Sequence, residues 1–77
     1  MEERFLMLIK EVLETEESLS LDTILEDLEC WDSLAELSLT SMVDDEFGIV
    51  IGYKDLKRMR SIRDIFDFII SNTKGNS

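Results

Sequence analysis

The serine near the middle of the chain is the residue with the clearest chemical potential. Ser33 follows Asp32 and precedes Leu34, and the only cysteine, Cys30, lies three residues earlier. A serine or cysteine becomes a strong nucleophile when a neighbouring base accepts its proton, and histidine is the usual base. The chain contains no histidine. The common hydrolase triads are therefore excluded, and two roles remain for Ser33, a helix cap or a point of attachment.

The acidic segment that begins at Asp44 is the stretch to compare with a metal-binding loop. If a calcium loop began there, its glycine position would hold Ile49 and its last ligand would be Asp55 instead of glutamate. The segment therefore does not match an EF-hand calcium loop. A zinc site rich in histidine or cysteine is excluded by composition. Paired carboxylates are plentiful, but a chain of 77 residues is too small to form the cleft of a glycosidase. We therefore expect no metal site and no catalysis by this chain's own side chains.

The charge of the chain is strongly negative and unevenly distributed. Eight basic and 18 acidic residues give a net charge of −10. The segment from Glu11 to Tyr53 holds thirteen acids and no lysine or arginine, whereas residues 54–77 hold six basic residues and three acids. A negative field repels nucleic acid and anionic membranes and attracts basic protein surfaces. We expect partners with basic docking patches, no nucleic-acid binding and no membrane insertion.

The first half of the chain predicts two helices joined by a long connection. Apolar residues at intervals of three and four predict an amphipathic helix over residues 2–14. Residues 15–31 contain enough leucine and isoleucine to lie across a core, with a short helical turn near residues 22–28. Ser33-Leu34-Ala35-Glu36 matches a capping box with Ser33 as the N-cap of a second helix. Gly48 is suited to end that helix in the left-handed conformation.

The second half predicts smaller helical pieces. Residues 49–51 are expected to form a packed linker, and residues 54–59 one or two helical turns. Ser61-Ile62-Arg63-Asp64 is a second cap, opening a helix with a buried side formed by Ile62, Ile65, Phe66, Ile69 and Ile70. The sequence therefore predicts an all-α fold, a small bundle of three to four helices with a long loop between helices one and two.

The single cysteine and the short apolar runs indicate the compartment. One cysteine excludes an internal disulfide and suits a reducing cytosol. The apolar run from Phe5 to Ile9 is too short to span a membrane, and no cleavage region accompanies it. We expect a cytoplasmic monomer without a signal peptide or membrane anchor.

The middle of the chain resembles the acyl carrier protein family. The triplet Asp32-Ser33-Leu34 is similar to that family's attachment motif for phosphopantetheine. Further residues of this chain match the second helix of the family and its exit: Leu37, Leu39, Val43, Asp44-Asp45-Glu46-Phe47 and then Ile51. Residues 61–69 resemble the last helix of the family. The resemblance covers residues 3–70 and implies a carrier domain over residues 1–70, followed by a flexible tail over residues 71–77.

The resemblance implies a function and a role for particular residues. A phosphopantetheinyl transferase would attach 4′-phosphopantetheine to Ser33, with Asp32 and Leu34 beside it, and the arm would hold an acyl or aminoacyl group as a thioester for partner enzymes. The implied partner-binding residues are Glu36, Asp44, Asp45 and Trp31. The implied acyl-pocket candidates are Leu39, Val43, Ile51, Leu56, Met59 and Phe68. The alternative is a small acidic helical adaptor that binds a basic protein without a prosthetic group.

Two departures from the family pattern bear on the pathway. Fatty-acid carriers usually have Gly-Ala before the Asp-Ser-Leu triplet, where this chain has Cys30-Trp31. The third-helix region is basic, and it would repel the basic docking patches of a fatty-acid synthase; its cations are Lys54, Lys57, Arg58, Arg60 and Arg63. These departures favour a specialised pathway over housekeeping fatty-acid synthesis, such as secondary-metabolite, surface-polysaccharide or aminoacyl-transfer systems.

Overall fold

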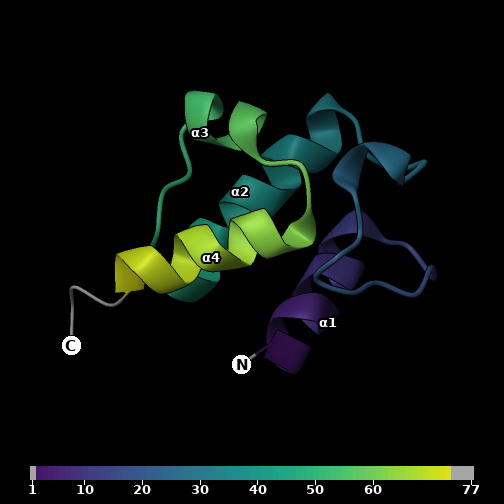
Figure 1. Cartoon of the computed structure of the whole chain (residues 1–77), viewed down its shortest axis with the longest axis horizontal. Helices are drawn as coiled ribbons and strands as arrows, with labels where there is room; N and C mark the ends of the chain where they lie inside the picture. The colour runs from purple at the N-terminus through teal and green to yellow at the C-terminus, as the bar shows by residue number, and fades with distance from the viewer. Residues whose placement is uncertain (1, 74–77) are drawn as a thin grey trace.

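Four α-helices and one 3₁₀ turn form the part of the chain that the structure, a computed structural model, describes, residues 2–73 (Figure 1). They are α1 (Glu2–Leu13), η1 (Leu25–Asp27), α2 (Ser33–Phe47), α3 (Tyr53–Arg58) and α4 (Ile62–Thr73). The one β feature within these residues is an isolated bridge between Ile24 and Ser61. The predicted all-α bundle with a long first loop is confirmed. None of the described helices combines the length and the apolar character needed to cross a membrane.

The core lies where α1, α2 and α4 pack together, and it contains only apolar side chains within the described residues. Phe5 is at its centre, with its ring centroid 6.2 Å from that of Phe47 and 5.3 Å from that of Phe66. The fully buried residues of these helices are Phe5 and Ile9 on α1, Leu39 and Val43 on α2, and Ile62, Ile65 and Ile69 on α4. The expected buried side of α4 is confirmed for Ile62, Ile65 and Ile69 and in part for half-buried Phe66. The prediction for Ile70 was wrong: this residue is 37% exposed, because it lies about 100° around the helix from Ile69.

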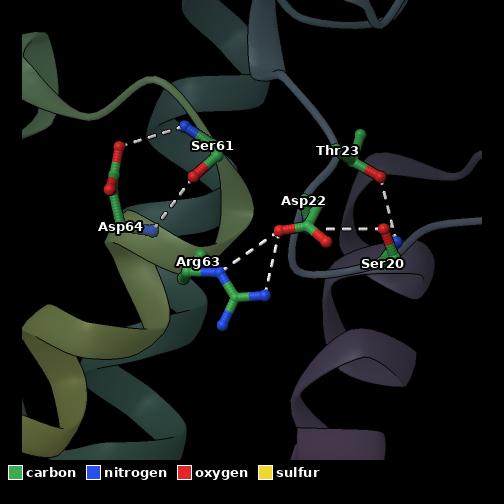
Figure 2. Close-up of polar contacts among 6 residues, drawn as sticks. All are labelled: Ser20, Asp22, Thr23, Ser61, Arg63 and Asp64. Atoms are coloured by element: carbon green, nitrogen blue, oxygen red, sulfur yellow. Dashed lines mark hydrogen bonds and ion pairs between the residues drawn. The ribbon is translucent and has the colours of Figure 1, made fainter.

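The long loop after α1 is fastened to the start of α4. Its residues Leu21, Leu25 and Leu28 are buried, which confirms that the segment lies across the core. The predicted turn near residues 22–28 is the shorter η1. Three backbone hydrogen bonds join the two segments, from Leu25 N to Arg60 O (2.8 Å), from Ile62 N to Thr23 O (3.1 Å) and from Arg63 N to Leu21 O (2.7 Å). The guanidinium of Arg63 also donates to the Asp22 carboxylate at 2.9 Å, as Figure 2 shows.

The ends of α2 and α4 define the remaining boundaries. Gly48 adopts the left-handed conformation (φ 67°, ψ 27°) and its amide donates to the Asp44 carbonyl, which confirms the predicted stop. Ile49 and Ile51 are buried on either side of exposed Val50, so residues 49–51 form the predicted packed linker. Helix α4 continues to Thr73, past the expected start of a tail at residue 71. The rest of that expected tail, residues 74–77, lies outside the described residues.

Candidate functional site

The N-cap of α2 is Asp32, and the prediction that Ser33 caps this helix was wrong. Asp32 has extended backbone angles (φ −142°, ψ −174°), and its Oδ1 accepts from the Ala35 amide at 2.8 Å. Its carbonyl accepts the next amide, that of Glu36, at 2.9 Å. A carboxylate at this position accepts a charge-assisted bond and meets the positive end of the helix dipole, so it outcompetes the hydroxyl beside it. The returning bond expected from the Glu36 side chain is likewise not formed within residues 2–73.

This cap makes Ser33 the first residue inside α2. Its side chain is exposed, and its hydroxyl makes no hydrogen bond with any other described residue. The first amides of a helix lack intrahelical partners, and together with the dipole they favour an anion near them. The position therefore offers an accessible hydroxyl in a setting that stabilises a phosphate attached to it.

A groove of about 320 Å³ opens beside Ser33, between α2 and α3. Its lining is mainly apolar and comes from both helices and from the linker between them: Ser33, Glu36, Leu37, Thr40, Ile51, Tyr53 and Leu56. The side chains of Leu37 and Tyr53 stand at the surface, 65% and 69% exposed, whereas Ile51 and Leu56 are buried below them. An exposed hydroxyl that adjoins an apolar groove is suited to a group with a phosphate at one end and an acyl chain at the other.

The six residues expected to form an acyl pocket are not gathered in one place. Ile51 and Leu56 line the groove beside Ser33. Leu39 and Val43 are fully buried and belong to the general core. Met59 lines a second, more polar hollow with Lys57 and other residues near the end of α3. The sixth, Phe68, is half-buried against the core.

Three groove residues were missed by the sequence reasoning. Leu37 and Thr40 follow Ser33 by four and seven residues, so the helical period alone places them on its face of α2. That spacing was the signal that could have found them. Tyr53 had no comparable signal, because its place in the groove depends on how α3 packs beside α2.

The residues expected to bind partners differ in exposure. Asp44 and Asp45 are exposed near the end of α2. Leu34, which was expected beside the attached phosphopantetheine, is 70% exposed at the start of the same helix. Glu36 and Trp31 are both half-buried, and Trp31 packs against the core. The two aspartates are therefore the more accessible members of the predicted partner-binding set, and Leu34 is an exposed apolar neighbour of Ser33.

One cation of α3 lies against the Tyr53 side chain, which lines the groove. The Lys57 Nζ lies 5.0 Å from the centroid of the Tyr53 ring. The neighbouring Tyr53 side chain raises the pKa of Lys57 above its ordinary value, and the negative charge of Glu36 raises it further. Lys57 is therefore protonated at neutral pH, and its charge offsets that of the acid on the opposite helix.

Comparison with known proteins agrees with this geometry. Residues 3–69 match the family described as "Phosphopantetheine attachment site". The solution NMR structure of a holo acyl carrier protein from Geobacter metallireducens is similar, with a TM-score of 0.83, 17% identity, and coverage of 96% of this chain and 86% of that one. A putative acyl carrier protein from Mycobacterium tuberculosis is also similar, with a TM-score of 0.74, 27% identity, and coverage of 86% and 89%. Comparison with curated protein sequences gives no match.

The family match includes almost every described residue, and the two solved structures share the four-helix architecture. Members of this family hold a group for other enzymes and are not themselves catalysts. The chain therefore belongs to the phosphopantetheine attachment site family, and it is a carrier that bears phosphopantetheine.

Proposed function

We propose that the Ser33 hydroxyl is the point where phosphopantetheine is attached. The observation that carries this proposal is the helix start itself. Asp32 occupies the cap, so the Ser33 hydroxyl is exposed and is bonded to no other described residue. When bound, the group supplies a terminal thiol that holds an acyl group as a thioester. The amides at the start of α2 stabilise the negative charge beside Ser33.

The attachment step requires a base that this chain does not provide. The Ser33 oxygen would attack the phosphorus of coenzyme A that carries pantetheine, and the bond to the adenosine bisphosphate leaving group would break. No histidine exists to accept the hydroxyl proton, and Asp32 Oδ1 is already bonded to the Ala35 amide. We assign the base to the phosphopantetheinyl transferase, and to Asp32 a contact with that enzyme and its metal.

The groove residues are assigned to the cargo. Leu37 and Tyr53 form exposed apolar walls beside Ser33, and Ile51 and Leu56 form the buried base. Apolar lining of this kind favours the hydrocarbon part of an acyl group over water. Of the expected pocket residues, we retain Ile51 and Leu56 for this role and treat Leu39 and Val43 as core.

The partners that we propose are the transferase and enzymes that load or remove the acyl group in the cytoplasm. Leu34 offers an exposed apolar contact near the attachment point, and Asp44 and Asp45 offer negative charge to basic docking patches. Trp31 and the basic α3 support a specialised pathway over housekeeping fatty-acid synthesis. A monomer suits a carrier that must leave one enzyme to reach the next.

Loading of the purified chain tests the proposal directly. The chain is incubated with coenzyme A, Mg²⁺ and a broad-specificity phosphopantetheinyl transferase, and its intact mass is measured. We expect a gain of one phosphopantetheine in the natural chain, none in Ser33→Ala, and the full gain in Ser41→Ala, which changes an exposed serine on the same helix. A gain that persists in Ser33→Ala would remove the proposed attachment point. Folded chain that gains no mass with several transferases would favour the helical adaptor.

A further inference from the structure

The cations of this carrier differ in whether they form ion pairs. Two of them close ion pairs across the fold, Arg4 with Glu46 at 2.8 Å and Arg63 with Asp22 at 2.9 Å. Helix α3 carries three more, and none of the three forms an ion pair within residues 2–73; they are Lys54, Lys57 and Arg58, all exposed. The paired cations fasten distant segments together. Those of α3, like exposed Lys10 and Arg60, form no ion pair within residues 2–73, and α3 is the helix on which three such cations gather.

The stability of α3 does not account for all of this charge. Lys57 and Arg58 lie in its last turn, where cations complement the helix dipole. Lys54 lies in its first turn, where a cation opposes the dipole, and it is four residues from Arg58, a spacing at which like charges repel. The helix has only six residues, and its N-cap, Gly52, supplies no side-chain hydrogen bond. The position of Lys54 therefore weakens a short helix, which points to a use outside the fold.

Exposed apolar side chains accompany these cations. Val50, in the linker before α3, is 74% exposed, and Tyr53, at the start of α3, is 69% exposed. Lys57 lies over the Tyr53 ring. Aromatic anchors with a charged border are typical of the residues that dominate protein interfaces.

We propose that one exposed surface, named here the α3 face, docks a partner enzyme. It consists of Val50, Tyr53, Lys54, Lys57 and Arg58. The partner offers an apolar socket for the exposed apolar side chains, and acidic residues of the partner border that socket. The inference rests on the proposed function, because Tyr53 also lines the groove beside Ser33 and the docked enzyme would act on the arm. It adds an acidic surface to the basic patches that the aspartates of α2 attract.

A protein is the occupant that the charges favour. The chain carries a net charge of −10, which repels the phosphates of nucleic acids and anionic lipids at long range. A partner surface is attracted by these cations, and is not repelled by the acids of α2, only if its own acids lie locally opposite α3. Because α2 and α3 flank the same groove, a partner needs a basic patch opposite one helix and an acidic patch opposite the other. A uniformly basic enzyme surface is excluded by this arrangement.

Photochemical crosslinking in cells that produce this chain identifies the occupant. Benzoylphenylalanine is placed at Tyr53 and, as a control, at Met7, an α1 residue that is 68% exposed. The protein captured from position 53 is then purified, and its affinity is measured for the natural chain, Lys54→Glu and Lys10→Glu. Both substitutions reverse one exposed lysine. We expect Lys54→Glu to weaken binding about tenfold and Lys10→Glu by less than about twofold, with affinity restored to Lys54→Glu when an acid of the partner is changed to lysine.

Several results would overturn the α3 face. They are equal capture from positions 53 and 7, capture only of nucleic acid, lipid or a second copy of this chain, and equal effects of the two lysine reversals. Circular dichroism of Lys54→Glu verifies that the helices persist. Loading at Ser33, measured by mass on the same variants, separates the two proposals. If the chain is loaded at Ser33 but its binding does not depend on the charge of Lys54, only the proposal of the α3 face is contradicted. If the chain is not loaded but still binds an acidic partner, only the proposal of attachment at Ser33 is contradicted.

Discussion

Two helices of this carrier, α2 and α4, begin near a serine that is followed three residues later by an acid. Only at α4 do the serine and the acid form a capping box. At α4, the Ser61 hydroxyl accepts from the Asp64 amide at 3.3 Å. The Asp64 carboxylate in turn accepts from the Ser61 amide at 3.2 Å (Figure 2). It also accepts from the Arg60 amide at 2.8 Å. Both side chains of this pair are occupied by the backbone.

At α2 the residue before the serine changes the outcome. Asp32 stands where α4 has Arg60, and its carboxylate takes the Ala35 amide. Ser33 is thereby moved one position into the helix, with an exposed hydroxyl that is bonded to no other described residue. The same serine-to-acid spacing therefore serves structure at α4 and leaves a reactive group accessible at α2.

The largest expected difference between the two starts is in loading. Ser33→Ala should abolish the mass gain produced by coenzyme A and a phosphopantetheinyl transferase, because the attacking oxygen is removed. Ser61→Ala should keep the full gain, because its hydroxyl serves only the backbone of α4. Intact-mass spectrometry of both variants measures this, and loading lost equally in both would contradict the contrast.

The next effect concerns the box at α4. Replacing both Ser61 and Asp64 by alanine should lower the free energy of unfolding by about 2 kcal/mol, roughly 1 kcal/mol for each cap interaction. Urea denaturation of the double variant and of each single variant measures the losses. A double variant that unfolds at the same urea concentration as the natural chain would show that this box does not stabilise α4.

The cap of α2 should contribute about half as much. Asp32→Ala should cost about 1 kcal/mol of unfolding free energy, because the Ala35 amide loses its acceptor. Asp32→Asn, which keeps an acceptor oxygen, is the matched control and should cost much less. Equal losses in the two variants would mean that the charge, and not the hydrogen bond, stabilises this helix start.

A smaller effect is expected for the stability of Ser33→Ala. Because Ser33 is not the cap, this variant should change the unfolding free energy by less than about 0.5 kcal/mol, as for an ordinary surface position. Thermal unfolding followed by circular dichroism measures the difference. A loss as large as that of Asp32→Ala would restore Ser33 as the cap.

The smallest effect should appear in acid. Hydrogen bonds from the Arg60 amide, and then from the Ser61 amide, lower the pKa of Asp64 below its ordinary value of 3.8. A depressed folded-state pKa stabilises the protein above the unfolded pKa, and the stabilisation is lost as the pH falls through the folded value. Asp64→Asn should therefore flatten the pH dependence of stability below about pH 4. Urea denaturation at a series of pH values between 2 and 5 measures the unfolding free energy. If its slope against pH were the same in Asp64→Asn as in the natural chain, this assignment would be contradicted.

The helices were predictable because their information is local. The recurrence of apolar residues at intervals of three and four identified α1, and Gly48 identified the end of α2. The start of α2 was harder, because Asp32 and Ser33 are adjacent and both are favourable caps. Their competition is settled by the rotation of the helix, which has to bury Ala35, and by the stronger carboxylate acceptor.

The groove could be predicted only in part. Ile51 and Leu56 were expected beside the acyl group, and they do line the groove. Tyr53 was not expected, because its contribution depends on the packing of α3 against α2 and not on any sequence period. The sequence did indicate that α3 is basic, but only the structure shows that Arg4 and Arg63 are paired whereas, among residues 2–73, the cations of α3 are not.

The fastening of the long loop to α4 also has a consequence for amide exchange. The amides of Leu25, Ile62 and Arg63 are each bonded across the junction between these two segments. None of them can exchange with solvent deuterium until the loop separates from α4, so the three should open together as one cooperative unit. The loop that leads to Ser33 therefore keeps its shape for as long as α4 remains docked, without a helix of its own longer than η1.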